Sequence, residues 1–339
     1  MTRFAAALAA ALLAPAAAAT AAAPPVATPQ VAERIAVPDG GWDLLAVDPG
    51  SRRLFVARTD GVTAVDLADG KVTGRLVGGS RLHDVVPIPG SGLAVATAGG
   101  TNSAILFETR TGKVRSEIKT GAKPDAAIYE PASRTVWVMN AGDGSISIVD
   151  PRTAKVAASV AVGGSLELPA LDGRGHLFVN VEDKNEIVEI GVATRKVIRR
   201  IALPGCDGPT GLAYAADGIL VSACGNGVAK LVRASDGKVA GEIAIGPHPD
   251  GAFADPGRKR VYIPSGGDGT LAILDTSGAL PVKVATVQTQ RGARTGAVDV
   301  ETGRVYLPAA RYEPAAAGER PKLVPGSVEI LVVQPGNRL

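Results

Sequence analysis

The sequence predicts an all-β fold, a seven-bladed β-propeller with four-stranded blades. A basic residue followed by valine recurs at intervals of 41 to 45 residues, and each interval contains four short apolar runs. A repeat near 40 residues with four strands per repeat is typical of propeller blades, which stack around a common axis. The recurring pairs are Lys71-Val72, Lys113-Val114, Lys155-Val156, Lys196-Val197, Lys238-Val239 and Lys283-Val284, and the pattern extends back to Gln30-Val31.

The third repeat shows how the four strands are assigned. Strands are expected at residues 126–130, 135–139, 145–150 and 155–162, because the segments between them are rich in turn-forming residues. Asp143-Gly144 precedes the third strand and suits a tight hairpin, since Gly adopts positive φ without strain. A single four-stranded sheet could not bury both faces, whereas sheets stacked in a ring can.

The two ends of the repeat region complement each other. The last repeat supplies three strands, at residues 295–300, 304–307 and 327–333, but no fourth. Residues 31–37 read as a fourth strand without the preceding three. We therefore expect the N-terminal strand to pair with the C-terminal three, which would close the ring and cover exposed sheet edges.

The N-terminal segment has the composition of a secretory signal peptide. Residues 1–3 give a short basic start, residues 4–14 are apolar, and small residues follow. The apolar stretch is too short for a membrane span. We expect a signal peptide at 1–21 cleaved after Ala19 or Ala21, a linker at 22–29, one propeller domain at 30–335 and a tail at 336–339. The mature chain is then periplasmic or secreted, with no membrane span.

Charge and composition argue against a nucleic-acid-binding protein. The net charge is +3, or about +2 once Arg3 leaves with the signal peptide, and the charges show no run of one sign. Nucleic-acid binding needs basic residues gathered on one face. Aromatic residues make up 4% of the chain, too few for a base-stacking platform. We expect a monomer that does not bind nucleic acid.

The two cysteines, Cys206 and Cys224, fall in the fifth repeat. They flank the two expected strands 211–214 and 219–223, which would form a hairpin that brings both cysteines to the same end of the blade. A disulfide is expected in an oxidising compartment, with two free thiols as the alternative. Neither cysteine is placed beside a histidine in the sequence, which argues against a cysteine nucleophile.

A recurring acidic position marks the start of the first strand in most repeats. It lies 11 to 13 residues after the repeat's first residue and would place the acids at the mouth of the central channel. Two hypotheses follow: an acidic mouth that binds a cation or a basic ligand, or acids that bond backbone amides of their own turn or of the next blade. The position holds Asp43, Asp84, Asp125, Glu167, Asp207 and Asp250, with Arg294 in the seventh repeat.

Two of the three histidines, His83 and His248, lie in the same zone. Because imidazole suits transition metals, they could hold a divalent cation at the mouth. No fixed metal-binding spacing such as His-x-x-x-His supports this assignment. The pattern requires no cofactor, and it assigns no catalytic residue.

Two further features would lie at the mouth. Residues 309–326 form a long interruption between the second and third strands of the last repeat, and Arg311 and Tyr312 on it could cover the channel. Long loops of this kind are functional or disordered, so a mobile Pro/Ala-rich segment is the alternative. Trp42, beside Asp43, could stack on a ligand.

Several phrases resemble the repeat of the YVTN/YncE-like β-propellers. These are Val136-Trp137-Val138-Met139-Asn140 followed by residues 144–150, and the Gly-x-x-Pro phrase at residues 121–125 and 246–251. The resemblance covers about residues 30–335 and implies a seven-bladed propeller of the exported bacterial type. That family brings no agreed catalytic residues.

Two classes of function are consistent with these observations. We expect a non-enzymatic exported binding module, which receives a small ligand or an exported protein partner at the channel mouth. The alternative is a periplasmic hydrolase or lactonase with an acidic, metal-dependent site there. Such enzymes need a few acids converging on one cation or water, whereas the acids here are spread around the ring.

Overall fold

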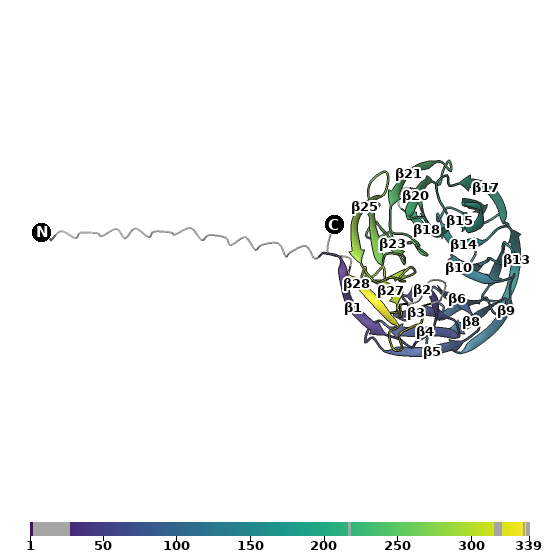
Figure 1. The fold of residues 1–339 in the computed structure, drawn as a ribbon, viewed down its shortest axis with the longest axis horizontal. Helices are drawn as coiled ribbons and strands as arrows, with labels where there is room; N and C mark the ends of the chain where they lie inside the picture. Colours follow the sequence, from purple (N-terminus) through teal and green to yellow (C-terminus); the bar gives the residue numbers. More distant parts are fainter. Residues whose placement is uncertain (3–27, 216–217, 315–320, 335, 337–339) are drawn as a thin grey trace.

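Seven four-stranded antiparallel sheets surround a central axis in the computed structural model, so the predicted seven-bladed propeller is confirmed (Figure 1). The structure describes residues 1–2, 28–215, 218–314, 321–334 and 336. The expected signal peptide and most of the expected linker, like most of the tail, lie outside the described residues. In Figure 1 the chain runs once around the ring and returns to its starting point.

Blades 1 to 3 each use four consecutive strands. Blade 1 contains β2 (Trp42–Asp48), β3 (Arg53–Arg58), β4 (Gly61–Asp66) and β5 (Val72–Gly78). Blade 2 contains β6 (Leu82–Ile88), β7 (Leu93–Ala98), β8 (Ser103–Glu108) and β9 (Val114–Lys119). Blade 3 contains β10 (Pro124–Glu130), β11 (Thr135–Asn140), β12 (Ser145–Asp150) and β13 (Lys155–Ala161), each within two residues of the predicted bounds.

Blades 4 to 6 repeat this order. Blade 4 contains β14 (Leu166–Leu171), β15 (His176–Val181), β16 (Glu186–Gly191) and β17 (Lys196–Ala202), with a short 3-10 helix at Glu182–Lys184. Blade 5 contains β18 (Pro209–Ala215), β19 (Ile219–Cys224), β20 (Val228–Arg233) and β21 (Val239–Ala244). Blade 6 contains β22 (Phe253–Asp255), β23 (Arg260–Ser265), β24 (Thr270–Asp275) and β25 (Val282–Gln288).

The seventh blade joins the two ends of the chain, as predicted. Its strands are β26 (Ala297–Val298), β27 (Val305–Ala309), β28 (Glu329–Gln334) and the N-terminal β1 (Gln30–Ala36). β1 pairs with β28 from Gln30↔Gln334 to Ala36↔Glu329. β26 is shorter than the strand expected at residues 295–300. Before it, Thr295 Oγ1 donates to the Asp43 carbonyl at 2.8 Å, and after it Asp299 N donates to the Arg304 carbonyl at 2.8 Å within a turn.

The core lies between neighbouring blades. The second and third strands of each blade are buried on both faces, as in β11, in which every residue is buried. This explains their continuous apolar runs, whereas the outermost strand β13 alternates between exposed and more buried residues. Phe55 of blade 1 meets Phe107 of blade 2 edge to face, with ring centroids 6.0 Å apart. Trp137 is 1% exposed, between blades 3 and 4.

The disulfide predicted in blade 5 is present. Cys206 and Cys224 are bonded with a Cα–Cα distance of 5.4 Å. The bond joins the segment leading into β18 to the end of β19, so it anchors the start of the innermost strand. Among the described residues, no helix has the length and apolar character needed to cross a membrane.

Candidate functional site at the channel mouth

The innermost strand of each blade begins with an irregularity that redirects one side chain. In blade 1, Trp42 pairs with Arg58 and Leu45 pairs with Val56, so two residues of β2 oppose one residue of β3. Such a β-bulge interrupts the ladder and re-aims the bulged side chain. The same shift occurs in β6, β10, β14 and β18. The second residue of each of these five strands is therefore available to the channel.

Register identifies the equivalent residue in every blade. In blade 6, Pro249 bridges to Ser265, which makes Asp250 the counterpart of Asp43. In blade 7, the pair Ala297↔Tyr306 matches Phe253↔Tyr262, which assigns Arg294. We call the seven equivalent residues the mouth ring: Asp43, His83, Asp125, Glu167, Thr210, Asp250 and Arg294.

The predicted acidic position and the mouth ring differ in two blades. Asp84 is one residue past the ring position and is 8% exposed. Its carboxylate accepts hydrogen bonds from Val85 N at 2.7 Å and Ala127 N at 2.9 Å, which links blade 2 to blade 3. Burial raises the pKa of Asp84 to about 7, although these two hydrogen bonds oppose the shift. This geometry matches the structural hypothesis for a recurring acid.

In blade 5 the ring position is Thr210, which the sequence analysis did not identify. Asp207 lies exposed in the segment before β18. Thr210 Oγ1 donates to the Pro249 carbonyl at 2.9 Å and so joins blade 5 to blade 6. A proline directly before the ring residue, as in Pro124-Asp125, Pro209-Thr210 and Pro249-Asp250, was the sequence signal that could have located it.

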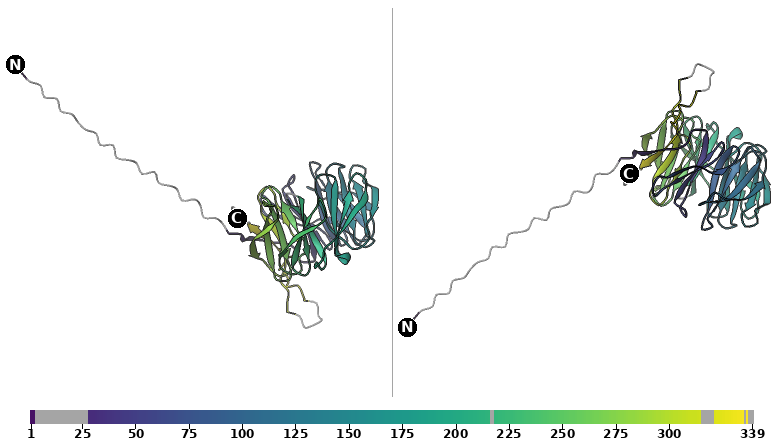
Figure 2. Two further views of the ribbon diagram at one scale, coloured as in Figure 1. Left: turned by 90° about the horizontal axis from the view of Figure 1, so that it is seen from above. Right: turned by 90° about the horizontal axis from the view of Figure 1, so that it is seen from below.

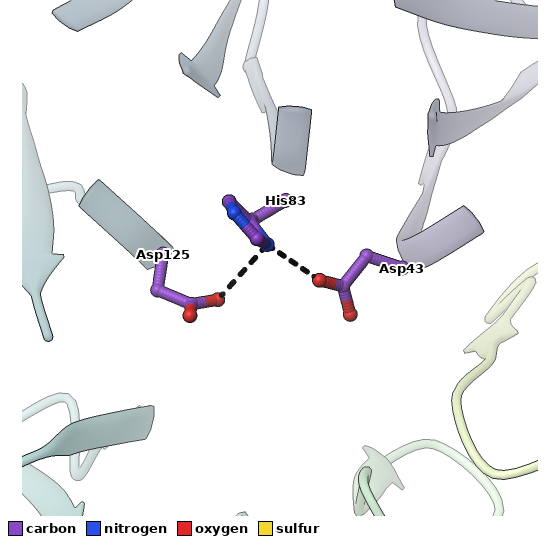
Figure 3. A group of neighbouring side chains, drawn as sticks. All are labelled: Asp43, His83 and Asp125. Carbon is purple, nitrogen blue, oxygen red and sulfur yellow. Dashed lines mark hydrogen bonds and ion pairs between the residues drawn. The ribbon is translucent and has the colours of Figure 1, made fainter. Parts of the chain in front are cut away.

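Three ring residues from neighbouring blades meet at one point (Figure 3). His83 Nδ1 lies 2.7 Å from Asp43 Oδ2 and 3.8 Å from Asp125 Oδ1. The hydrogen bond with Asp43 raises the pKa of His83, although burial opposes the shift. Burial and the nearby Asp43 raise the pKa of Asp125 to about 6, with His83 acting against them. One ligand atom from each residue lies within 4.8 Å of the others, so this group could hold a metal ion.

The remaining ring residues add two carboxyl groups and one cationic partner. Burial, followed by the charges of Asp125 and Asp250, raises the pKa of Glu167 to about 9. Burial also raises the pKa of Asp250 to about 6, although Arg294 Nε lies 2.9 Å from its Oδ2 and opposes the shift. The mouth ring thus has four carboxyl groups against one guanidinium and one imidazole. Its electrostatics favour a bound cation.

A groove of about 530 Å³ extends the mouth over blades 4 to 7. His248 is exposed on it and is not part of the group formed by Asp43, His83 and Asp125. A separate cavity of about 270 Å³ lies along the innermost strands of all seven blades, and its lining is mostly apolar, including Leu44, Leu168 and Phe253. Charged residues on the groove are Glu182, Asp207, Asp250 and Arg294.

The long interruption after β27 begins as a paired stem. Val324 N donates to the Arg311 carbonyl at 2.9 Å, and Tyr312 bridges to Leu323. The stem projects from one face of the ring in Figure 2. Arg311 and Tyr312 are exposed and do not contribute to the lining of the groove or of the channel cavity. Residues 315–320 lie outside the described part of the chain.

Trp42 is half-buried at the first position of β2. It packs against the apolar cluster that contains Ala310 and Val328 of the closing blade. Trp42 therefore precedes Asp43 in the sequence, and its indole lies near the base of the stem.

Comparisons with known proteins support the fold and leave the family open. No family model matches the chain, and no curated protein matches it, so the resemblance to the YVTN/YncE-like propellers is not confirmed. A chain of hydrazine synthase from Kuenenia stuttgartiensis is 18% identical with a TM-score of 0.68, covering 79% of this chain and 92% of that one. At these identities the similarity shows a shared propeller fold alone.

Two other solved structures give the same result. A chain of the mitotic checkpoint complex is 14% identical with a TM-score of 0.72, covering 93% of this chain and 98% of that one. U3-55K is 11% identical with a TM-score of 0.73, covering 89% of this chain and 99% of that one. The propeller fold is consistent with a binding module, and it hosts many unrelated functions.

Proposed function

We propose that this chain is a non-enzymatic binding module that holds a positively charged ligand at its mouth ring. The observation that carries the proposal is the set of four carboxyl groups on the ring, three of which have strongly raised pKa values. Among the described residues, no hydrogen bond reaches the carboxyl groups of Asp125 or Glu167, and His83 Nδ1 lies 3.8 Å from Asp125 Oδ1, too far for one. A bound cation would directly offset the repulsion among these carboxyl groups in their ionised form.

The shape of the mouth supports a ligand of modest size. The groove of about 530 Å³ falls within the range typical of small-molecule sites. The apolar cavity below it could accept an aliphatic portion of the same ligand. A small amine, or a lysine- or arginine-bearing segment of an exported partner, has this combination of charge and apolar stem.

We further propose that the protein is exported to the periplasm or secreted. The disulfide between Cys206 and Cys224 supports this, because such bonds persist in oxidising compartments. The composition of residues 1–21 supports it as well.

A metal-dependent hydrolase or lactonase is the second candidate. The convergence of Asp43, His83 and Asp125 favours it, since a cation held by three protein groups can activate a bound water. Turnover of simple lactones and esters in the presence of zinc or manganese discriminates between the two. Hydrolysis that disappears in the Asp125→Asn variant would favour the enzyme over the binding module.

The binding proposal is tested by titrating the purified protein with trilysine while following tryptophan fluorescence. Trp42 reports on the mouth, whereas Trp137 is 1% exposed and serves as an internal reference. A double variant, Glu167→Gln with Asp250→Asn, is expected to weaken binding at least about tenfold, since each removed contact of a desolvated charge is worth about 1 kcal/mol or more.

The matched control is Asp69→Asn with Asp236→Asn, which removes two acids that cap exposed turns elsewhere. Its affinity for trilysine should stay within about twofold of the wild type, as expected for distant exposed charges screened by salt. Absence of binding, or equal weakening by the control, would overturn the proposal.

A further inference from the structure

We propose that Asp43, His83 and Asp125 form a binding site for one divalent transition-metal ion, with zinc as the ion used to test it. The inference rests on the proposed function, since both place a cation at the mouth ring. It goes further by specifying the ion class and its ligands. The three residues come from β2, β6 and β10, the innermost strands of three consecutive blades.

The ligand atoms already face one another. His83 Nδ1 lies 2.7 Å from Asp43 Oδ2 and 3.8 Å from Asp125 Oδ1. Figure 3 shows the imidazole between the two carboxyl groups. Ligands about 2.0–2.2 Å from a tetrahedral zinc ion are roughly 3.3–3.6 Å apart. The two observed separations bracket this value. An ion could therefore replace the Nδ1 proton with only small movements of the side chains.

Without an ion, the group has two carboxylates and only one imidazole nitrogen to face them. A single nitrogen, His83 Nδ1, faces two carboxylates and can give its one hydrogen to Asp43 alone, because 3.8 Å is too long for a hydrogen bond to Asp125. The Asp125 side chain is 30% exposed, so water reaches it only in part. A metal ion would satisfy both carboxylates and the imidazole together.

The surroundings hold the three residues in place. Thr295 Oγ1 donates to the Asp43 carbonyl at 2.8 Å, which fixes the bulge of β2 from the closing blade. Asp84 accepts hydrogen bonds from Val85 N and Ala127 N, which ties the strand of His83 to the strand of Asp125. Outer groups of this kind orient metal ligands and raise affinity.

Gly99 provides the space for the imidazole. A Cβ atom at this position would lie 2.7 Å from His83 Nε2, so a larger residue would displace the ring. The imidazole is therefore seated in a shaped pocket with Nδ1 turned to the carboxylates. Gly99 follows β7 in the same blade as His83, so this placement does not depend on the two carboxylates.

The mixture of ligands selects the type of ion. One imidazole nitrogen and two carboxylates suit zinc and other first-row transition ions. Calcium and magnesium prefer oxygen ligands alone, and calcium takes six to eight of them. We therefore expect zinc, cobalt or manganese to bind well ahead of calcium or magnesium.

His176 supplies an internal control. Its Nδ1 lies 2.7 Å from Asp172 Oδ2, the same His–Asp separation as at the mouth, and its Nε2 lies 3.9 Å from Glu189 Oε1. The two carboxylates thus face different ring nitrogens rather than one. No three ligand atoms of this second group are within reach of one ion among the described residues.

The test is isothermal titration of the metal-stripped mature protein with zinc chloride, repeated with calcium chloride, and supported by the visible spectrum of cobalt-loaded protein. We expect one zinc ion per chain. Asp125→Asn should weaken zinc binding at least about 100-fold, because even changes to outer-shell groups cost about 10–100-fold. His176→Gln should bind zinc within about twofold of the wild type.

No backbone amide of the described residues donates to the Asp125 carboxyl group, so its variant should fold, and circular dichroism checks this. His83→Gln provides a second variant and should abolish the cobalt spectrum. Absence of zinc binding, binding unchanged in both variants, or loss of binding in His248→Gln but not in Asp125→Asn would overturn the assignment. Trilysine binding that persists without any zinc binding would refute this site and leave the proposed function intact.

Discussion

The two ends of the innermost strands use their acidic residues in opposite ways. At the exit end, where each strand leads into its first turn, acids accept hydrogen bonds from that turn. Glu130 accepts from Ala132 N at 3.0 Å, Ser133 N at 2.7 Å and Ser133 Oγ. At the mouth end, the carboxylates of the ring accept no backbone amide among the described residues. The other exit-end acids with such turn contacts are Asp48, Asp172, Asp255 and Asp299.

The pKa values of two glutamates show the consequence. Burial acts to raise the pKa of Glu130, but the hydrogen bonds from Ser133 and Ala132 prevail and lower it. Burial raises the pKa of Glu167 to about 9, and the charges of nearby acids add to the shift. No hydrogen-bond donor among the described residues opposes it. Acids at the exit end therefore stabilise the fold, whereas those at the mouth are available for a ligand.

The largest expected effect belongs to the exit end. Asp299 is 0% exposed and accepts hydrogen bonds from Arg52 Nη2 at 2.9 Å, Glu301 N at 3.1 Å and Thr302 Oγ1 at 2.8 Å. Asp299→Asn should lower the free energy of unfolding by about 3 kcal/mol, because it breaks a buried charge-assisted network. Urea denaturation measures this. Asp43→Asn at the mouth should cost less than about 1 kcal/mol, and equal costs would break the comparison.

The next effect concerns the disulfide, which links the segment before β18 to the end of β19 at the mouth end of blade 5. Cys206→Ala with Cys224→Ala should lower the free energy of unfolding by about 2–3 kcal/mol, since the bond closes a loop with a sequence separation of 18. Reduction of the wild type with dithiothreitol should give a similar loss in thermal or urea unfolding. A loss below about 0.5 kcal/mol would mean that packing alone holds the start of β18.

Much of this fold could be predicted from the sequence, because the repeat encodes it redundantly. The period indicated a propeller of seven repeats, the turn residues indicated four strands per repeat, and the incomplete first and last repeats indicated the closed ring. The pairing of Cys206 with Cys224 followed from the hairpin between them. In blade 3, the ends of β12 at Ser145 and Asp150 were predicted correctly.

The mouth ring was harder to predict for two physical reasons. The spacing from the repeat's first residue to the ring position varies, from 12 residues for His83 to 14 for Thr210, so a spacing of 11 to 13 selected Asp84 and Asp207 in their place. The contact between Asp43 and His83 joins residues 40 apart in sequence, which only the blade packing brings together. The prediction paired His83 with His248 instead, as the zone contained both.

A third effect is pH-dependent and specific to the mouth. With a folded pKa of about 9 against an ordinary value of 4.5, Glu167 contributes stability when protonated, and this is lost as the pH rises from about 4.5 through about 9. Glu167→Gln stays neutral, so in the presence of chelator it should match the wild type near pH 4 and be about 2 kcal/mol more stable near pH 8.

Glu130→Gln is the control at the exit end, with the opposite sign. The pKa of Glu130 is lowered in the fold, so its contribution is present above the unfolded value and is lost as the pH falls. The variant should be less stable than the wild type near pH 8 by about 1–2 kcal/mol. If both glutamine variants changed stability in the same direction at that pH, the two ends would not differ as proposed.

The smallest effect tests how far the mouth extends along the stem after β27. Arg311 and Tyr312 are exposed, and neither lines the groove, so Arg311→Ala with Tyr312→Ala should change the free energy of unfolding by less than about 0.5 kcal/mol. Trilysine and zinc affinities should stay within about twofold of the wild type. A tenfold loss of trilysine affinity at unchanged stability would place the stem in the binding surface, as its long loop first suggested. Because the backbone pairing of the stem does not depend on these two side chains, such a loss could not be attributed to unfolding.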